Sequence, residues 1–201
     1  NDLVEDTVRR LNSNYNITSK DELKNKLENL FKDHISEDTQ IKEVKTEDKQ
    51  LELKDILKPS LVKTEVECEN WQETVRKSGK LLLDKGIVTK EYIANMIKNI
   101  KDRGPYVVIT PGVALVHAAP DEGVKKVGIS LITLERPVEF NHSQNDPVEI
   151  VIAFASPDKE KHVKAITTLV DKLYNDKFKE KLSSAEDSKQ VMNLLNNEKE
   201  G

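Results

Sequence analysis

Cysteine is almost absent from this chain, which has 201 residues and a single thiol, Cys68. One cysteine can form neither an internal disulfide nor a cysteine-based zinc site, and such sparse usage is typical of a reducing compartment. No apolar run approaches the ~20 residues that a membrane span requires, and no signal peptide is visible. The sequence therefore predicts a soluble, cytoplasmic protein with no membrane insertion.

Long runs of like charge are also missing, although 34% of the residues are charged and the formal net charge is −4. Basic arms that bind nucleic acid need such runs, so we expect no direct contact of this chain with DNA or RNA. The phosphate-loop, dinucleotide, nucleophile-elbow and H-E-x-x-H zinc motifs are all absent. Nucleotide, dinucleotide and metal-hydrolase chemistry thereby lose support. We expect neither a cofactor nor a bound metal.

Proline and glycine do not occur before Pro59. Within residues 1–50, apolar residues follow helical spacing at 3–11 and 23–31 and then become sparse among charged side chains. We expect a helical extension and charged linker there, too small to bury a core alone. The chain begins with Asn1 rather than methionine, which favours a piece excised from a longer protein.

From residue 51 onward, helical stretches combine with β-branched runs bounded by glycine or proline. Asn70 and Thr89 are typical N-caps, while Gly86 and Gly104 are typical helix stops. We expect a short helix at 51–59, two capped helices, strands at 106–110, 113–116, 127–134 and 149–155, a helix at 158–174 and two short ones up to Asn196. Helices on either side of the strands predict an α/β fold, a mixed β-sheet covered by helices on both faces in a three-layer α/β/α sandwich. Residues 51–201 are assigned to this domain.

One histidine, His117, ends a β-rich run in "GPYVVITPGVALVHAAPDEGV". A histidine flanked by valine and alanine is more often a buried structural residue than a catalyst. Here Pro111-Gly112 forces a turn before the short strand, which places the histidine at the strand end. Ala118 and Ala119 leave space beside the ring for a macromolecular substrate. These features favour a presented, functional side chain.

Three other histidines are less constrained by the sequence. His162 lies about one turn into the helix expected from residue 158, where unpaired N–H groups attract anions. His34 stands where the extension gives way to its linker, and His142 lies in the loop "FNHSQNDP". We expect His34 and His142 to be structural or solvated.

Two stretches, "GPYVVITPGVALVHAAPDEGV" and "GISLITLERPVEFNHSQNDPVEIVIAFASPDKEKH", resemble the enzyme IIA domain of the bacterial sugar phosphotransferase system. The likeness is to the mannitol/fructose class, and within it to ascorbate-type members, and it extends from about residue 51 to the C-terminus. It implies that His117 accepts a phosphoryl group from the phosphocarrier protein HPr and that His162 faces it as a second catalytic histidine. The chain would then be a phosphohistidine-based phosphotransferase component.

The resemblance has two departures beside the active histidine. The family usually has proline before it, where this chain has Val116, and ascorbate-type members commonly have a basic residue two positions after it, where Ala119 stands. The lost side chain is expected to weaken phosphate binding or change the choice of partner. It does not remove the nucleophile.

Three functions fit this resemblance. In one, the domain passes the phosphoryl group to a sugar-specific IIB partner in transport. In the second, it is the sugar-responsive C-terminal domain of a transcriptional antiterminator or activator of the BglG type, and the extension at residues 1–50 favours this regulator. In the third, a degenerate domain serves only as a docking surface.

Overall fold

The structure, a computed structural model, describes residues 52–119, 122–157 and 163–196. Its strands are β1 (Val62–Val66), β2 (Val108–Thr110), β3 (Val113–Val116), β4 (Gly128–Val138) and β5 (Val148–Ala155). Its α-helices are α3 (Leu53–Ile56), α4 (Trp71–Asp84), α5 (Lys90–Arg103), α6 (Val163–Leu173), α7 (Asp176–Ser183) and α8 (Ser188–Asn196), and a short 3₁₀ helix spans Pro59–Leu61. The expected helical extension at 1–50 lies outside the described residues.

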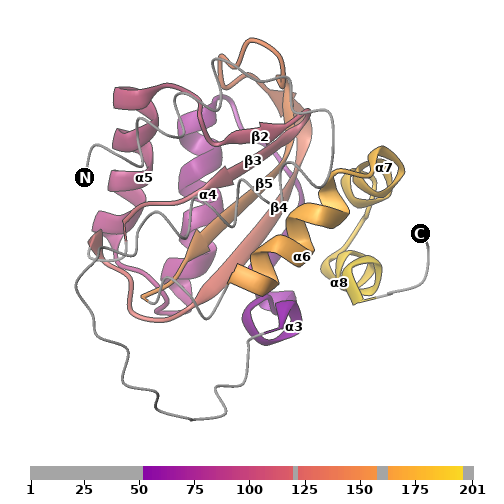
Figure 1. The fold of residues 1–201 in the computed structure, drawn as a ribbon, viewed down its shortest axis with the longest axis horizontal. Coiled ribbons are helices and arrows are strands. Elements are labelled where there is room, and N and C mark those ends of the chain that lie inside the picture. Colours follow the sequence, from indigo (N-terminus) through magenta and orange to yellow (C-terminus); the bar gives the residue numbers. More distant parts are fainter. Residues whose placement is uncertain (1–51, 120–121, 158–162, 197–201) are drawn as a thin grey trace, which may run out of the picture.

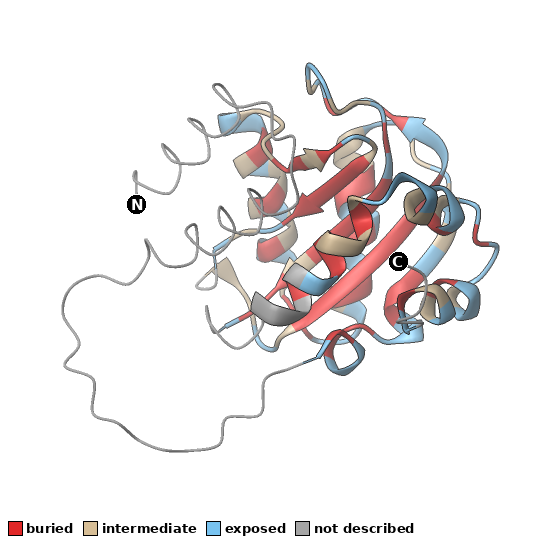
Figure 2. Cartoon of the chain, turned by 45° about the vertical axis from the view of Figure 1, so that its right-hand side comes forward, coloured by how far each residue is buried: buried red, intermediate tan, exposed pale blue. Residues whose placement is uncertain are grey.

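The strands form one five-stranded mixed sheet in the order β1-β4-β5-β3-β2. Helices α4 and α5 lie on one side of it, whereas α3, α6, α7 and α8 lie on the other (Figure 1). Buried residues gather along the strands and on the inner faces of the helices (Figure 2). The predicted α/β sandwich is therefore confirmed for the described part of the chain.

Strand β3 is apolar throughout and β5 contains a single charged residue, because the sheet is covered on two faces. Strand β4 is parallel to β1 and antiparallel to β5, and β3 is parallel to β5 and antiparallel to β2. The last pair between β3 and β5 is Val116 with Ala153, and β4 begins at the same end, where Gly128 pairs with Ala155. The residue that follows β3 therefore lies at the end of the strands where β5 ends and β4 begins.

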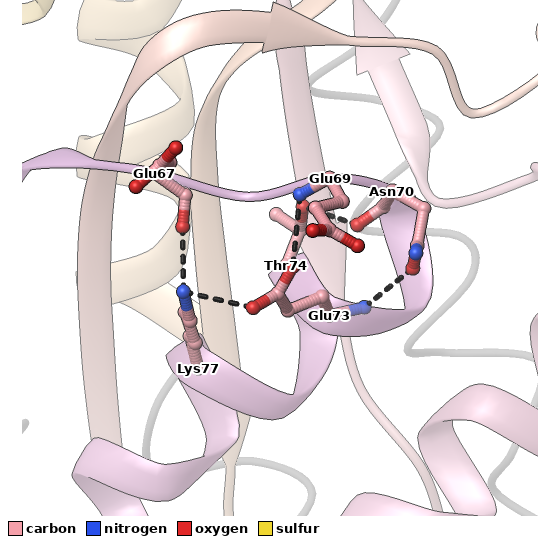
Figure 3. A network of polar contacts seen from close by, with 6 residues as sticks. All are labelled: Glu67, Glu69, Asn70, Glu73, Thr74 and Lys77. Atoms are coloured by element: carbon pink, nitrogen blue, oxygen red, sulfur yellow. Dashed lines mark hydrogen bonds and ion pairs between the residues drawn. The ribbon is translucent and has the colours of Figure 1, made fainter.

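Polar contacts fix the start of α4 after the chain leaves β1 (Figure 3). The Asn70 carboxamide oxygen accepts the Glu73 amide at 3.0 Å, as its predicted capping role requires. The Glu73 carboxylate accepts the Glu69 amide at 2.8 Å and pairs with Lys77 at 2.9 Å. Lys77 also donates to the Glu67 carbonyl at 2.6 Å. The turn between β1 and α4 is thus held by side chains from the first two turns of the helix.

Helix α5 begins and ends where the sequence predicts, but its N-cap residue does not make the expected side-chain hydrogen bond. Thr89 occupies the N-cap position without a side-chain capping bond, and Gly104 ends the helix with a φ of 82°. The buried face includes Tyr92 together with Met96 and Ile100. This tyrosine lies on the i, i+4 row of those two residues, a spacing that the sequence already contained.

Two strands differ most from the sequence prediction, and β2 begins at Val108 rather than at residue 106. Strand β1 was not predicted, because its short sequence VKTEV carries two charges and lies at the sheet edge, where a strand needs no continuous apolar run. Strand β4 runs on past Leu134 to Val138 through three exposed residues, because pairing with β5 resumes at Val138. Strand β4 is therefore longer than its local composition predicts, because its last residue pairs with β5.

None of the helices in the described part of the chain combines the length and the apolar composition that crossing a bilayer requires.

Candidate functional site

The turn before β3 has the form that its sequence predicted. Gly112 adopts a φ of 79°, in the left-handed region that glycine occupies without strain. Its carbonyl accepts the amides of Glu149 and Ile150 at 2.8 and 3.0 Å, which fixes β3 beside β5. The four residues of β3 are buried, and His117, the next residue, is exposed. The imidazole therefore lies at the surface, directly after the last residue of a buried strand.

Two contacts orient the imidazole. The Nδ1 atom of His117 lies 3.2 Å from the carbonyl oxygen of Leu115. A carbonyl can only accept, so in this hydrogen bond Nδ1 carries the proton. The ring of Tyr106 meets the imidazole edge-on, with centroids 5.9 Å apart and planes at 86°. In the neutral side chain Nε2 therefore keeps its lone pair and is the nucleophilic atom.

The surroundings of His117 keep the imidazole neutral. Although the residue is exposed, protein atoms crowd its ring, and this desolvation is the largest cause that lowers its pKa below 6.5. The Leu115 carbonyl opposes the shift, and the positive charge of Arg103, at the end of α5, adds to it. A neutral imidazole near neutral pH suits a nucleophile.

The backbone that follows His117 is held by two side chains. The Tyr92 hydroxyl accepts the Ala118 amide at 3.1 Å and lies 2.7 Å from the Phe154 carbonyl, to which it donates. The Ala119 amide donates to the Glu122 carboxylate at 2.8 Å. The small side chains expected to leave room beside the ring are half-buried at Ala118 and exposed at Ala119.

The other histidines of the sequence analysis fall in different places. His162 and His34 lie outside the described residues, so the pairing of His162 with His117 stays a prediction. His142 lies in the loop between β4 and β5, where its Nδ1 accepts the amides of Gln144 and Asn145 at 3.2 and 3.0 Å. That is the structural role expected for it.

The described part of the chain contains no cluster of side chains suited to a metal ion. Within residues 52–119, 122–157 and 163–196, no three His, Cys, Asp or Glu side chains gather closely enough to hold an ion. The single thiol, Cys68, is half-buried, and desolvation raises its pKa, which disfavours the thiolate form.

Three residues near His117 were missed by the sequence analysis. Tyr92 was visible as part of a helical row, and Arg103 and Tyr106 flank the Gly104-Pro105 pair that ends α5. Nothing local in the sequence relates these residues to a histidine more than ten positions later. Their proximity follows from the return of the chain through β2 and β3.

Comparison with known proteins gives a consistent match over this domain. The model of the family described as "Phosphoenolpyruvate-dependent sugar phosphotransferase system, EIIA 2" matches residues 55–198. The ascorbate-specific phosphotransferase EIIA components of Escherichia coli and Salmonella typhimurium are each 36% identical over 135 residues, which is 67% of this chain and 88% of those proteins.

Solved structures show the same fold. The mannitol-specific cryptic enzyme IIA CmtB from Escherichia coli has a TM-score of 0.65 and 31% identity, covering 72% of this chain and 98% of that one. Enzyme IIA mannitol from Escherichia coli, solved in complex with phosphorylated enzyme IIB mannitol, has a TM-score of 0.58 and 22% identity, covering 70% and 98%.

Proposed function

Because the chain belongs to the type-2 EIIA family of the phosphoenolpyruvate-dependent sugar phosphotransferase system, we propose that it works in transport. It accepts a phosphoryl group from the phosphocarrier HPr on His117 and passes it to a sugar-specific IIB protein or domain. The observation that carries this proposal is the imidazole itself, exposed at the end of β3 with Nδ1 directed at the Leu115 carbonyl.

The transfer balances without a metal or a cofactor. The bond between phosphorus and a histidine nitrogen of HPr breaks, and a bond between phosphorus and Nε2 of His117 forms. The lone pair of Nε2 is used, the donor nitrogen recovers its own, and the proton stays on Nδ1, hydrogen-bonded to the Leu115 carbonyl. Because both partners are phosphohistidines, the exchange is nearly isoenergetic, and the protein mainly aligns the groups and stabilises charge.

Arg103 supplies a cation for that charge. Its positive charge already acts on the imidazole of His117. The same field that disfavours an imidazolium favours a phosphoryl group on the ring. Ascorbate-type members commonly have a basic residue at the position of Ala119. This chain has none there, and the positive charge of Arg103 takes the place of that residue. His162, as the second histidine of the site, stays part of the proposal.

The transport role has more support than the regulatory one. The curated relatives that match two thirds of this chain are described as ascorbate-specific transport-system EIIA components. The BglG-type regulator, which the extension at 1–50 favoured, has no support among these comparisons. The IIB partner is inferred from the family and from the enzyme IIA and IIB complex cited above. The ascorbate system is the first to test.

The experiment is phosphorylation of the purified chain by phosphoenolpyruvate, enzyme I and HPr, followed by addition of a purified ascorbate-specific IIB protein. We expect acid-labile phosphate on the wild type and on His142→Ala, the matched control, and none on His117→Ala. Loss of that phosphate when IIB is added supports transport. Wild-type uptake by His117→Ala would overturn the assignment of the acceptor, and retention of phosphate in the presence of IIB would favour the regulator.

A further inference from the structure

A tyrosine hydroxyl replaces a hydrogen bond of the sheet directly beside His117. Tyr92 is 1% exposed, and its hydroxyl reaches from α5 to the point where β3 leaves β5. It accepts the Ala118 amide at 3.1 Å and lies 2.7 Å from the Phe154 carbonyl, while the Ala118 carbonyl is farther away at 3.3 Å. Its single proton goes to Phe154.

The register of β3 shows what this hydroxyl displaces. The Leu115 amide donates to the Val107 carbonyl on the β2 side at 2.8 Å. Amides alternate in direction along a strand, so those of Val116 and Ala118 face β5. Since Val116 pairs with Ala153, a continued parallel ladder would join the Ala118 amide directly to the Phe154 carbonyl. The hydroxyl is inserted between these two groups.

We propose that Tyr92 is a positioning residue for His117: its hydroxyl stops the β3–β5 ladder after the pair of Val116 with Ala153 and thereby fixes the backbone from which the imidazole projects. Without the hydroxyl, the ladder closes onto β5 and turns the peptide on either side of His117. The bond from Nδ1 to the Leu115 carbonyl depends on that local backbone, because it spans only two residues. Tyr92 therefore acts on the nucleophile through the tautomer of His117.

The bridge is permanent over the physiological pH range. Burial raises the pKa of Tyr92, and the Glu122 carboxylate and Tyr106 act in the same direction, against an opposing bond from the Ala118 backbone. The hydroxyl thus keeps its proton and remains both donor and acceptor. Its role is to hold geometry rather than to transfer protons.

The chain contains a matched control. The Tyr174 hydroxyl also donates to a strand carbonyl, that of Ile109 in β2, at 3.3 Å, and its side chain is half-buried. Ile109 precedes Thr110, which pairs with the first residue of β3, so this contact lies at the opposite end of β3 from His117. Tyr92→Phe deletes a hydroxyl with its bonds to Ala118 and Phe154, whereas Tyr174→Phe deletes a hydroxyl with its bond to Ile109. Only the first hydroxyl lies beside the imidazole.

The test compares these variants of the full chain in two measurements. Imidazole ¹⁵N spectra report the tautomer of His117, and steady-state phosphorylation by phospho-HPr reports kcat and KM. We expect Tyr92→Phe to shift His117 away from the Nδ1–H tautomer and to lower kcat on the order of 10- to 100-fold with KM little changed, as misplacement of a reacting group does. Tyr174→Phe should leave both unchanged.

Several outcomes overturn the proposal. An unchanged tautomer in Tyr92→Phe, or equal losses of kcat in both variants, would leave Tyr92 with a structural role only. If Tyr92→Phe does not fold, the wild type decides: a hydroxyl proton of Tyr92 with a nuclear Overhauser effect to the Ala118 amide supports the bridge, and a freely exchanging hydroxyl refutes it. The kinetic arm rests on the proposed function, whereas the tautomer arm stands even if His117 accepts no phosphate.

Discussion

The Nδ1 atom of His117, the residue that follows β3, lies 3.2 Å from the carbonyl oxygen of Leu115 in that strand. This short-range contact assigns different roles to the two ring nitrogens. Nδ1 is committed to a backbone acceptor, and Nε2 is left with its lone pair. The end of β3 therefore supplies both the nucleophile and the group that fixes its tautomer.

The first prediction concerns the phosphorylated atom. We expect phosphate on Nε2 of His117 and none on Nδ1, because only Nε2 has a free lone pair in the observed tautomer. Two-dimensional ¹H–¹⁵N correlation spectra of the phosphorylated, ¹⁵N-labelled chain distinguish the two attachment sites by their phosphorus couplings. Phosphate on Nδ1 would show that the Leu115 contact is broken before transfer.

The second prediction concerns pH. Desolvation and the Arg103 charge lower the pKa of His117, so the imidazole protonates at lower pH than an ordinary histidine, and the rate of phosphorylation should fall on that acid limb. The sign for stability is the same: a depressed histidine pKa favours folding above 6.5 and loses that contribution as pH falls through the folded-state value.

Arg103→Gln tests the charge contribution separately. Removing the cation should move the acid limb to higher pH and, by weakening phosphoryl stabilisation, lower the rate by roughly tenfold. Lys101→Gln is the matched control, because it removes an exposed cation of the same helix that is not among the groups that shift the pKa of His117. If the rate–pH profiles of the two variants coincide, Arg103 has no specific effect on His117.

The third prediction compares two glycines with positive φ, one in open space and one close to a neighbouring side chain. Gly123 has a φ of 117°, and a Cβ there would lie 2.3 Å from the Thr89 hydroxyl oxygen. Gly104 has a φ of 82° with open space around it. We expect Gly104→Ala to cost about 1 kcal/mol of unfolding free energy and Gly123→Ala about 1–3 kcal/mol more. Urea denaturation measures both, and equal losses would mean that Thr89 moves aside freely.

The fourth prediction concerns the loop between β4 and β5. The Asp146 carboxylate accepts the amides of Phe140 and His142 at 2.9 and 2.7 Å. Asp146→Ala leaves both amides without this acceptor, and we expect it to lower the unfolding free energy by about 1–3 kcal/mol. The loop lies at the end of β5 remote from His117, so the phosphorylation rate should stay at the wild-type value.

Glu139→Gln is the control for that variant. A hydrogen bond to Asp146 raises the pKa of Glu139, because ionisation of Glu139 places a second negative charge beside that carboxylate. A glutamine offers a donor to Asp146 without that second charge, so the stability of the variant near pH 7 should match or exceed that of the wild type. A large loss in Glu139→Gln would show that the ionised carboxylate has another role in the loop.

Local signals predicted most helix boundaries because the responsible interactions are local. Asn70 caps α4 through a bond that spans three residues, and Gly104 ends α5 by its own conformation. Strand β1 was missed, since an edge strand with charged residues has little apolar signal, and β4 was predicted too short, since its last residues pair with β5. Pairing partners decide such elements, and they are not adjacent in sequence.

The sequence by itself determined the histidine at the end of a glycine-bounded strand, the small residues after it and the sandwich of helices and strands around it. These follow from residue types and short-range spacing. Only the tertiary structure decided that Tyr106 contacts the imidazole, that the charge of Arg103 acts on it, and that the Tyr92 hydroxyl holds the next peptide. Those three residues come from α5 and the turn after it, and they reach His117 only because β2 and β3 bring the chain back across the sheet.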